Sequence, residues 1–256
     1  MELTIATWNV NSIRARLNQV LNFIDENNID ILCIQETKVE DNLFPKEEFE
    51  NLGYEVAVYG QKRFNGVATI SKFGFEAVEP YPDQKNHKRL LISKIKGITI
   101  FNAYFPNGQS PDSEHFIYKL NFINNLKKYL EDNYKTEDNI IILGDFNVAM
   151  DDIDVYDPVA MEGKIGFHIK EREVLKNLYQ WGFIDTFRKF NKEKAFSWWD
   201  YRAGNFWKNI GLRIDYIWAT KPLADKCINC YIDKRERKRK KPSDHAPVVA
   251  VFRLEG

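Results

Sequence analysis

The chain has 256 residues, of which 44% are hydrophobic, so it is long enough to bury a substantial core. Its 37 basic and 37 acidic side chains cancel, which excludes a global positive field and leaves only local clusters to attract a polyanion. The first residues lack the basic and apolar regions of a signal peptide, and no run approaches the roughly 18 apolar residues of a membrane span. We therefore expect a cytoplasmic protein with no membrane partner.

Segments rich in β-branched and aromatic residues recur along the chain and predict strands. In chain order they cover residues 3–10, 30–36, 54–60, 66–71, 98–105, 139–147, 213–219 and 247–253. Apolar residues at helical spacing predict helices, the first with Ile13, Leu17, Val20, Leu21 and Ile24 on one face, the second with Phe116, Leu120, Ile123 and Leu126, and the third over 171–181. Residues 151–168 show no periodicity and predict a long loop.

The predicted strands and helices alternate through the whole chain. No Pro/Gly/Ser-rich linker, internal repeat or low-complexity stretch divides it. We therefore expect a single domain over residues 1–256, of the α/β class, in which helices cover packed sheets. Nothing in the sequence indicates obligate oligomerisation, so a monomer is expected.

The three cysteines are an odd number, which favours reduced thiols over a disulfide framework. They are Cys33, Cys227 and Cys230. Cys227 and Cys230 form a C-x-x-C, but no second pair of Cys or His residues stands nearby to complete a tetrahedral zinc site. We interpret this pair as small apolar residues of a strand or turn.

Polar residues stand at one end of four of the predicted strands. They are Asn9 and Asn11, then Glu36, then Asp145 and Asn147, and finally Asp244 and His245. A single such residue is commonly part of a turn, but four strand ends can converge on one rim of a sheet. Their oxygen atoms would suit Mg²⁺, with Mn²⁺ as a substitute, better than zinc.

One histidine accompanies these oxygen donors. An additional acid such as Asp215 can orient the ring of His245 and stabilise its charged form. The alternative for Asp215 is an ion pair with Arg213 or Arg202. A divalent cation, carboxylates and an oriented imidazole together suit the hydrolysis of a phosphate ester.

Eight segments resemble, in order, the motifs of the exonuclease III family of abasic (AP) endonucleases, in its bacterial-type branch. They are TWNVNSIRAR (7–16), IQETK (34–38), YFPNG (104–108), LGDFN (143–147), DTFR (185–188), SWWDYR (197–202), GLRIDY (211–216) and SDHAPV (243–248). Single motifs of this set occur across the wider endonuclease, exonuclease and phosphatase superfamily, but eight in register span nearly the whole chain. The resemblance implies a DNase I-like, four-layered α/β sandwich of two packed mixed β-sheets flanked by helices.

The resemblance also implies an activity. It is magnesium-dependent hydrolysis of the phosphodiester backbone of duplex DNA 5′ to abasic sites, which leaves a 3′-hydroxyl for base excision repair, with 3′ to 5′ exonuclease and 3′-end cleaning activity. Two alternatives are a general phosphodiesterase or DNase of the same superfamily and a DNA-binding relative without catalysis. Ser110 replaces an arginine of some relatives, and the loop ending at His168 is individual, so the balance of endonuclease and exonuclease activity stays open.

Site roles follow from the same resemblance. The metal would lie among Asn9, Glu36, Asp145, Asn147, Asp244 and His245, with Glu36 as the principal ligand. The catalytic residues would be Tyr104, Asp145, Asn147, Asp215 and His245. Asp145, supported by Asn147, would orient or deprotonate the attacking water, while His245 would bind the scissile phosphate. Whether Tyr104, Asp145 or His245 takes the proton of the water stays open.

Aromatic and basic residues interleave at Trp198, Trp199, Tyr201 and Arg202, a pattern that suits stacking on bases but also occurs in core strands. The resemblance implies that Trp198, Leu212 and Ile214 wall a pocket for a flipped sugar without its base, from which normal nucleotides are excluded by size. Flanking phosphates would be contacted by Lys62, Arg63, Arg89, Asn107 and Lys208.

The run Lys234 to Lys241 holds the densest charge in the chain, with seven basic residues in eight positions. Because it leads directly into the SDHAPV segment, we interpret it as a contact for the DNA backbone. A solvated loop and a nuclear-targeting signal are the alternatives.

Overall fold

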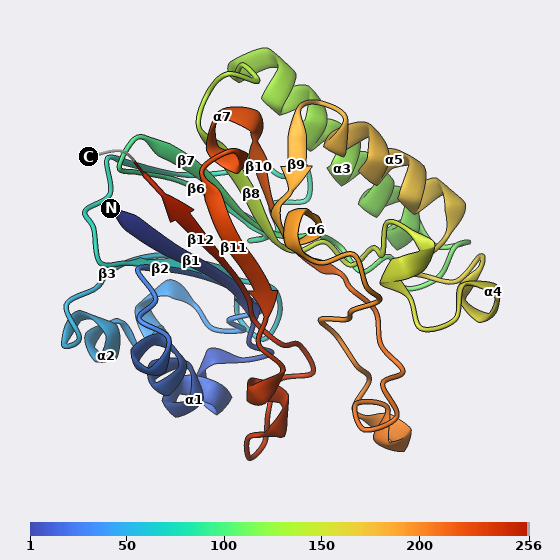
Figure 1. The fold of residues 1–256 in the computed structure, drawn as a ribbon, viewed down its shortest axis with the longest axis horizontal. Coiled ribbons are helices and arrows are strands. Elements are labelled where there is room, and N and C mark those ends of the chain that lie inside the picture. The colour runs from blue at the N-terminus through green and yellow to red at the C-terminus, as the bar shows by residue number, and fades with distance from the viewer. Residues whose placement is uncertain (255–256) are drawn as a thin grey trace.

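Two mixed β-sheets pack face to face at the centre of the computed structural model, which describes residues 1–254 (Figure 1). The first sheet has the order β11-β12-β1-β2-β4-β3, whose strands span Cys227–Ile232, Val248–Arg253, Glu2–Asn9, Ile31–Gln35, Val67–Ser71 and Glu55–Tyr59. The second has the order β5-β6-β7-β8-β10-β9, whose strands span Ala77–Pro80, Leu90–Ile95, Ile98–Tyr104, Ile140–Asp145, Asp215–Thr220 and Phe183–Asp185. Each sheet has one parallel pair, β1 with β2 and β7 with β8, among antiparallel neighbours.

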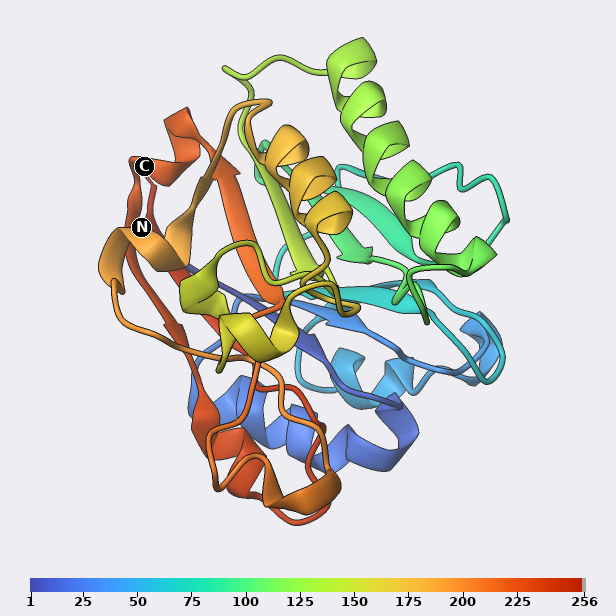
Figure 2. The same ribbon diagram turned by 90° about the vertical axis from the view of Figure 1, so that its right-hand side faces the viewer.

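Helices cover the outer face of each sheet (Figure 1). On the first sheet these are α1 (Ile13–Glu26) and α2 (Lys46–Glu50), and on the second α3 (Glu114–Asn133) and α5 (Ile169–Tyr179), which lie side by side (Figure 2). Shorter elements are α4 (Pro158–Met161), α6 (Thr186–Phe190), α7 (Lys221–Ala224) and the 3₁₀ turns η1 (Asp41–Leu43), η2 (Asp152–Asp154), η3 (Arg202–Gly204) and η4 (Lys234–Lys238). The layer order helix, sheet, sheet, helix confirms the predicted four-layered α/β sandwich. Within residues 1–254, no helix has the length and apolarity needed to cross a membrane.

Side chains that alternate along each strand divide the core into layers. Ile5, Leu143 and Ile217 face inward and belong to one cluster between the two sheets. Trp8 lies three residues after Ile5 on β1, so its side chain faces the opposite side of the sheet, outward. It meets Phe23 of α1 edge to face, with ring centroids 5.3 Å apart. Each sheet is therefore apolar on both faces, which explains the nearly continuous apolar runs in its central strands.

Each of the strands predicted from the sequence is present, with ends within two residues of the prediction. The predicted helices are α1, α3 and α5, and the predicted loop over 151–168 also contains η2 and α4. The predicted strands omit β5, β6, β9 and β11, and for β11 the sequence indicated either a strand or a turn. Two of these have only four and three residues, too few for a pattern, whereas β6 is a mostly buried apolar run without alternation.

Of the strand and the turn that the sequence indicated for the C-x-x-C, the strand is correct, because Cys227 and Cys230 lie on β11 and both are buried. A β-bulge lies between Cys227 and Asn229 and shifts the register against β12. Burial raises the pKa of the Cys230 thiol, whose sulfur accepts a hydrogen bond from Thr186 Oγ1. These thiols are therefore core residues of the first sheet.

Candidate active site

Three strands each carry a polar residue at one end, on the side that faces the other sheet, and these three ends lie at the same edge of the sandwich. On β1 and β8 the inward-facing positions end at Asn9 and Asp145, and on β10 they begin at Asp215. Strand register pairs Asp145 with Tyr104 on one side and with Asp215 on the other. Asn9 then reaches across from the other sheet, where its Nδ2 donates to Asp145 Oδ2 over 2.9 Å. The predicted convergence of strand ends is therefore present.

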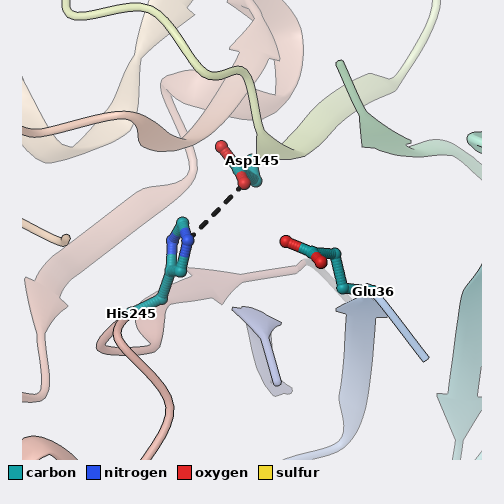
Figure 3. A group of neighbouring side chains, drawn as sticks. All are labelled: Glu36, Asp145 and His245. Atoms are coloured by element: carbon teal, nitrogen blue, oxygen red, sulfur yellow. Dashed lines mark ion pairs between the residues drawn. The ribbon is translucent and has the colours of Figure 1, made fainter. Parts of the chain in front are cut away.

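Glu36, Asp145 and His245 form a group able to hold a metal ion (Figure 3). One ligand atom from each lies within 4.8 Å of the others. Asn9 Nδ2 also donates to Glu36 Oε1, over 2.8 Å, so one amide joins both carboxylates. The two carboxylates suit Mg²⁺ or Mn²⁺, which prefer oxygen ligands, and the group lacks the thiolates of a structural zinc site.

The backbone at two residues of the site, Glu36 and Asn147, is left-handed, a conformation that costs energy for a residue such as glutamate and less for asparagine. Glu36 has φ of 52° and Asn147 has φ of 53°. The turn at Glu36 is held because Thr37 and Lys38 donate their backbone N–H groups to Gly66 and Asn65. Strain that neighbouring hydrogen bonds maintain in this way is typical of functional sites.

Asp145 lies in an environment that favours its protonated form. Burial raises its pKa to about 7; the nearby Asp215 carboxylate contributes to the rise, while His245 opposes it. Asn147 fixes the carboxylate through its backbone N–H, 2.9 Å from Oδ1, and through Nδ2, 3.3 Å from Oδ2. A carboxylate so oriented and with a pKa near neutrality suits proton transfer at physiological pH.

His245 is held by Asp215, as the sequence predicted. Nδ1 lies 2.9 Å from Oδ2 of Asp215, whose carboxylate also accepts a hydrogen bond from Ser197 Oγ over 2.6 Å. Burial alone would lower the pKa of His245, but Asp215 and then Asp145 reverse this and raise it to about 10. The ring is therefore cationic at neutral pH, and Nε2 lies 3.7 Å from Asp145. The alternative pairing of Asp215 with Arg213 is wrong, since Arg213 pairs with Asp154 and Asp185.

Tyr104 and Arg89 form one unit beside this cluster. The Arg89 guanidinium lies over the Tyr104 ring, 4.9 Å from its centroid, and donates to the Tyr104 carbonyl over 3.4 Å. Burial, followed by the charges of Glu36 and Asp145, raises the pKa of Tyr104 well above its ordinary value. The phenol therefore keeps its proton and acts as a hydrogen-bond donor.

Asp244 and Asn11 contact each other through a hydrogen bond beside the cluster. Asp244 accepts from Trp198 Nε1 over 2.9 Å and from Asn11 Nδ2 over 3.2 Å. Burial would raise its pKa, but His245 and the Trp198 bond hold the value below the ordinary range. In this structure the Asp244 carboxylate therefore orients Trp198, although it lines the same cavity as Glu36.

A cavity of about 480 Å³ joins the polar cluster to an apolar pocket. Its polar side is lined by Glu36, Tyr104, Asn107, Asp145, Asn147, Asp244 and His245, and its apolar side by Tyr156, Met161, Ile165, Trp198, Leu212 and Ile214. The sequence predicted Trp198, Leu212 and Ile214 but missed the walls that come from the 151–168 loop. The absence of periodicity in that loop was the only signal available.

A buried ion pair holds the loops that wall this cavity. Lys119 of α3 and Glu171 of α5 have no exposed side-chain surface. Lys119 Nζ donates to the carbonyls of Asn107 and Asn147, over 3.1 and 2.8 Å. Glu171 Oε2 accepts from the N–H of Gly166, over 2.8 Å, and it also caps the first turn of α5. One ion pair thus connects the Asn107 loop, the Asn147 turn and the pocket wall at Gly166.

The predicted base contact at Trp199 is wrong in this structure. Trp199 is fully buried against Phe196 and Ala246, while the adjacent Trp198 faces the cavity. The side chains of Tyr201 and Arg202 are exposed, as a DNA contact requires, although Arg202 forms an ion pair with Asp200. Neighbouring residues on an extended segment face opposite sides, so only one of two consecutive tryptophans can reach the cavity.

Two packed sheets with carboxylates, an amide and a cationic imidazole at one edge suit a phosphoesterase whose site could hold a metal ion. The chain belongs to the Endonuclease/Exonuclease/phosphatase family, which matches residues 6–245.

Named relatives cover almost the whole chain. Exodeoxyribonuclease III of Haemophilus influenzae is 36% identical, over 96% of this chain and 98% of its own. The structure of an AP endonuclease from Archaeoglobus fulgidus is 42% identical with a TM-score of 0.96, over 98% of this chain and 100% of that chain. The 3′ phosphatase NExo from Neisseria, solved with a product DNA hairpin, is 35% identical with a TM-score of 0.95 over the same shares.

Proposed function

We propose that this protein is a magnesium-dependent DNA-repair nuclease that cleaves duplex DNA 5′ to abasic sites and leaves a 3′-hydroxyl, with 3′ to 5′ exonuclease and 3′-end cleaning activity. It acts as a cytoplasmic monomer on duplex DNA with abasic sites or blocked 3′ ends. The names of its relatives, exodeoxyribonuclease III and AP endonuclease, support this activity.

The observation that carries the proposal is that one cavity contains both the polar cluster and an apolar pocket. The pocket walls at Trp198, Leu212 and Ile214 are continuous with the cavity that exposes Asp145 and His245. A sugar without a base has lost stacking and pairing, so it is extruded at lower cost than a normal nucleotide. A close-fitting apolar pocket beside the hydrolytic groups would accept such a sugar and exclude one that carries a base.

The residues divide the proton and charge chemistry between them. Burial raises the pKa of Asp145 to about 7 in the site without metal, and Asn147 fixes the carboxylate, so Asp145 is suited to orient the attacking water and accept its proton. His245 is cationic and Tyr104 is protonated, so both donate to the phosphate oxygens as negative charge develops there. We therefore assign the role of base, which the sequence left open, to Asp145.

Glu36 would be the principal ligand of the magnesium ion, and Asn9 fixes its carboxylate beside that of Asp145. When bound, the cation supplies Lewis-acid stabilisation of the phosphoryl oxygens. Asn147 maintains the Asp145 carboxylate at the edge of the sheet, and Asp215 maintains the charge of His245. The protein contribution is therefore a prearranged set of charges in a buried site.

The test is incision of a labelled duplex that carries one tetrahydrofuran abasic analogue, with magnesium or with EDTA, beside an undamaged duplex. We expect magnesium-dependent cutting immediately 5′ to the analogue only. Asp145→Asn should lower incision by about 10²- to 10⁴-fold, the usual contribution of general acid–base catalysis, while the affinity for the duplex is kept. Equal cutting of the undamaged duplex would favour a general DNase instead.

A second candidate is removal of 3′-terminal phosphates, because NExo of Neisseria bears the description 3′ phosphatase. This reaction needs the polar cluster but not an extruded internal sugar. A duplex with a recessed 3′-phosphate measures it directly. If the phosphate is removed and the internal analogue is not incised, 3′-end cleaning is the main activity.

A further inference from the structure

A second cavity, of about 270 Å³, opens beside the candidate site. It lies between the segment 200–207 and the segment 237–242, which extend side by side from one end of the molecule in Figure 1. Asp200 and Asn205 line this cavity and the active-site cavity alike, so the two are neighbours. Its first wall is aromatic, with Tyr201, Phe206 and Trp207, and Trp207 is 75% exposed.

The opposite wall is the basic run, and the structure shows that this run is anchored. Gln19 of α1 donates to the Glu236 carbonyl over 2.8 Å and to its carboxylate over 3.0 Å. Arg237 is buried, donates to the Ser243 carbonyl over 2.6 Å and stacks on Phe206. Arg239 pairs with Glu26 of α1. The alternative of a freely solvated loop is therefore wrong for the first part of the run.

Three exposed cations of the run are left over from this anchoring. Lys238, Lys240 and Lys241 are exposed, and none forms an ion pair with a residue of the described part of the chain. The chain as a whole has no net charge, so this is a local cluster and not part of a general positive field. Lys238 lines the cavity opposite the aromatic wall, and Lys240 and Lys241 follow it closely in the chain. Cations held beside an aromatic wall suit a sugar–phosphate chain.

We propose that Lys238, Lys240 and Lys241, which we name the lysine rim, bind the backbone of the DNA strand beyond the nucleotide in the pocket, with Trp207 facing the same strand. This inference rests on the proposed function, because it extends the DNA path from the active-site cavity. The lysine rim adds affinity through phosphate contacts and takes no part in hydrolysis. Its contribution is the same for damaged and intact duplex, since phosphates carry no sequence information.

The experiment measures affinity against salt by fluorescence anisotropy, with a labelled duplex containing the tetrahydrofuran analogue, in EDTA so that cleavage does not interfere. The variant is Lys238→Ser, Lys240→Ser and Lys241→Ser together. The control variant, Lys96→Ser, Lys135→Ser and Lys221→Ser, removes the same charge from exposed positions near the opposite ends of the strands. A thermal melt of both variants checks that the fold is kept.

We expect the slope of log Kd against log salt to fall by up to about 2.7 in the lysine-rim variant, about 0.9 for each phosphate that a lysine no longer neutralises, on damaged and intact duplex alike. The slope of the control variant should remain that of the wild type, and so should its kcat at saturating DNA with magnesium. Trp207→Ala should weaken binding without changing the slope, because an aromatic contact releases no counterions.

Equal slopes for wild type, lysine-rim variant and control variant would overturn the proposal and point to an acidic protein as the partner of this surface. An equal fall in both variants would also overturn it, because only total charge would then matter. Failure of the wild type to incise the analogue would refute the proposed function instead, and the binding slopes would still decide the role of the lysine rim.

Discussion

Nδ1 of His245 lies 2.9 Å from Oδ2 of Asp215, and both side chains are buried. Burial opposes the charged ring, and Asp215 is foremost among the groups that overcome it and raise the pKa of His245 to about 10. Asp215→Asn should therefore move this pKa down toward its ordinary 6.5. It should also lower incision by about 10- to 100-fold, the usual loss when a supporting partner of a site residue is removed.

A pH titration of the His245 ring by NMR, in metal-free protein, measures the shift. Asp215→Glu is the matched variant, because it keeps the negative charge and should restore part of the pKa. A pKa in Asp215→Asn equal to that of the wild type would show that another group maintains the charged ring.

Stability of the metal-free protein should decline as pH rises. Asp145 and His245 both have pKa values raised by folding, to about 7 and about 10. The folded state therefore binds protons more tightly than the unfolded chain, so each group contributes stability that is lost as pH rises. The contribution of Asp145 is lost between its ordinary pKa of 3.8 and about pH 7, and that of His245 between its ordinary pKa of 6.5 and about pH 10. Urea unfolding in EDTA at pH 5, 7 and 9 should give a falling free energy of unfolding. In Asp145→Asn the fall between pH 5 and 7 should be smaller, and a rise with pH would contradict the assignment.

Glu36→Gln should weaken divalent-metal binding by more than about tenfold. Removal of a residue that only supports a metal ligand already weakens binding by about tenfold or more, and Glu36 is a ligand itself. The substitution keeps the size of the side chain and removes one of the two carboxylates of the metal group. Titration with Mn²⁺, followed by electron paramagnetic resonance, measures the affinity without reference to activity. Glu162→Gln, in the 151–168 loop and outside this group, is the control and should bind Mn²⁺ as the wild type does. Equal affinity in Glu36→Gln would remove Glu36 from the metal site.

Substitutions of the two adjacent tryptophans should have different effects, Trp199→Ala mainly on stability and Trp198→Ala mainly on selectivity. Trp199 is fully buried, so Trp199→Ala should lower the free energy of unfolding by about 3–5 kcal/mol. Trp198 is only half-buried and faces the cavity, so Trp198→Ala should cost less stability but reduce the preference for abasic over intact duplex. Chemical denaturation and the ratio of kcat/KM on the two duplexes measure the effects. If Trp198→Ala leaves that ratio unaltered, Trp198 is not a wall of the selecting pocket.

The strand ends of the site were predictable because each polar residue follows or precedes an apolar strand. Asn9, Asp145 and Asp215 also share the inward parity of their strands, which brings them together once the sheets pack. The choice between Trp198 and Trp199 was not predictable, because the two are neighbours with the same chemistry. It depends on which side of the segment faces the sheet.

Two kinds of site residue gave no sequence signal. Met161 and Ile165 lie in the aperiodic loop, where apolar residues have no pattern that assigns a direction. Lys119 and Glu171 lie on amphipathic helices, where charged residues ordinarily face water. Their burial follows from the carbonyl and N–H groups that the loops present to them, which only the folded chain brings within reach.

The ion pair of Lys119 and Glu171 has a consequence for how this enzyme can be altered. Since it contacts both the Asn147 turn and the Gly166 wall, a shift in one should be transmitted to the other. Substitutions in the wall and in the turn should then combine non-additively, as expected for residues that share partners. Substitutions that enlarge the pocket for a bulkier lesion would therefore have to be chosen together with compensating substitutions near the Asn147 turn.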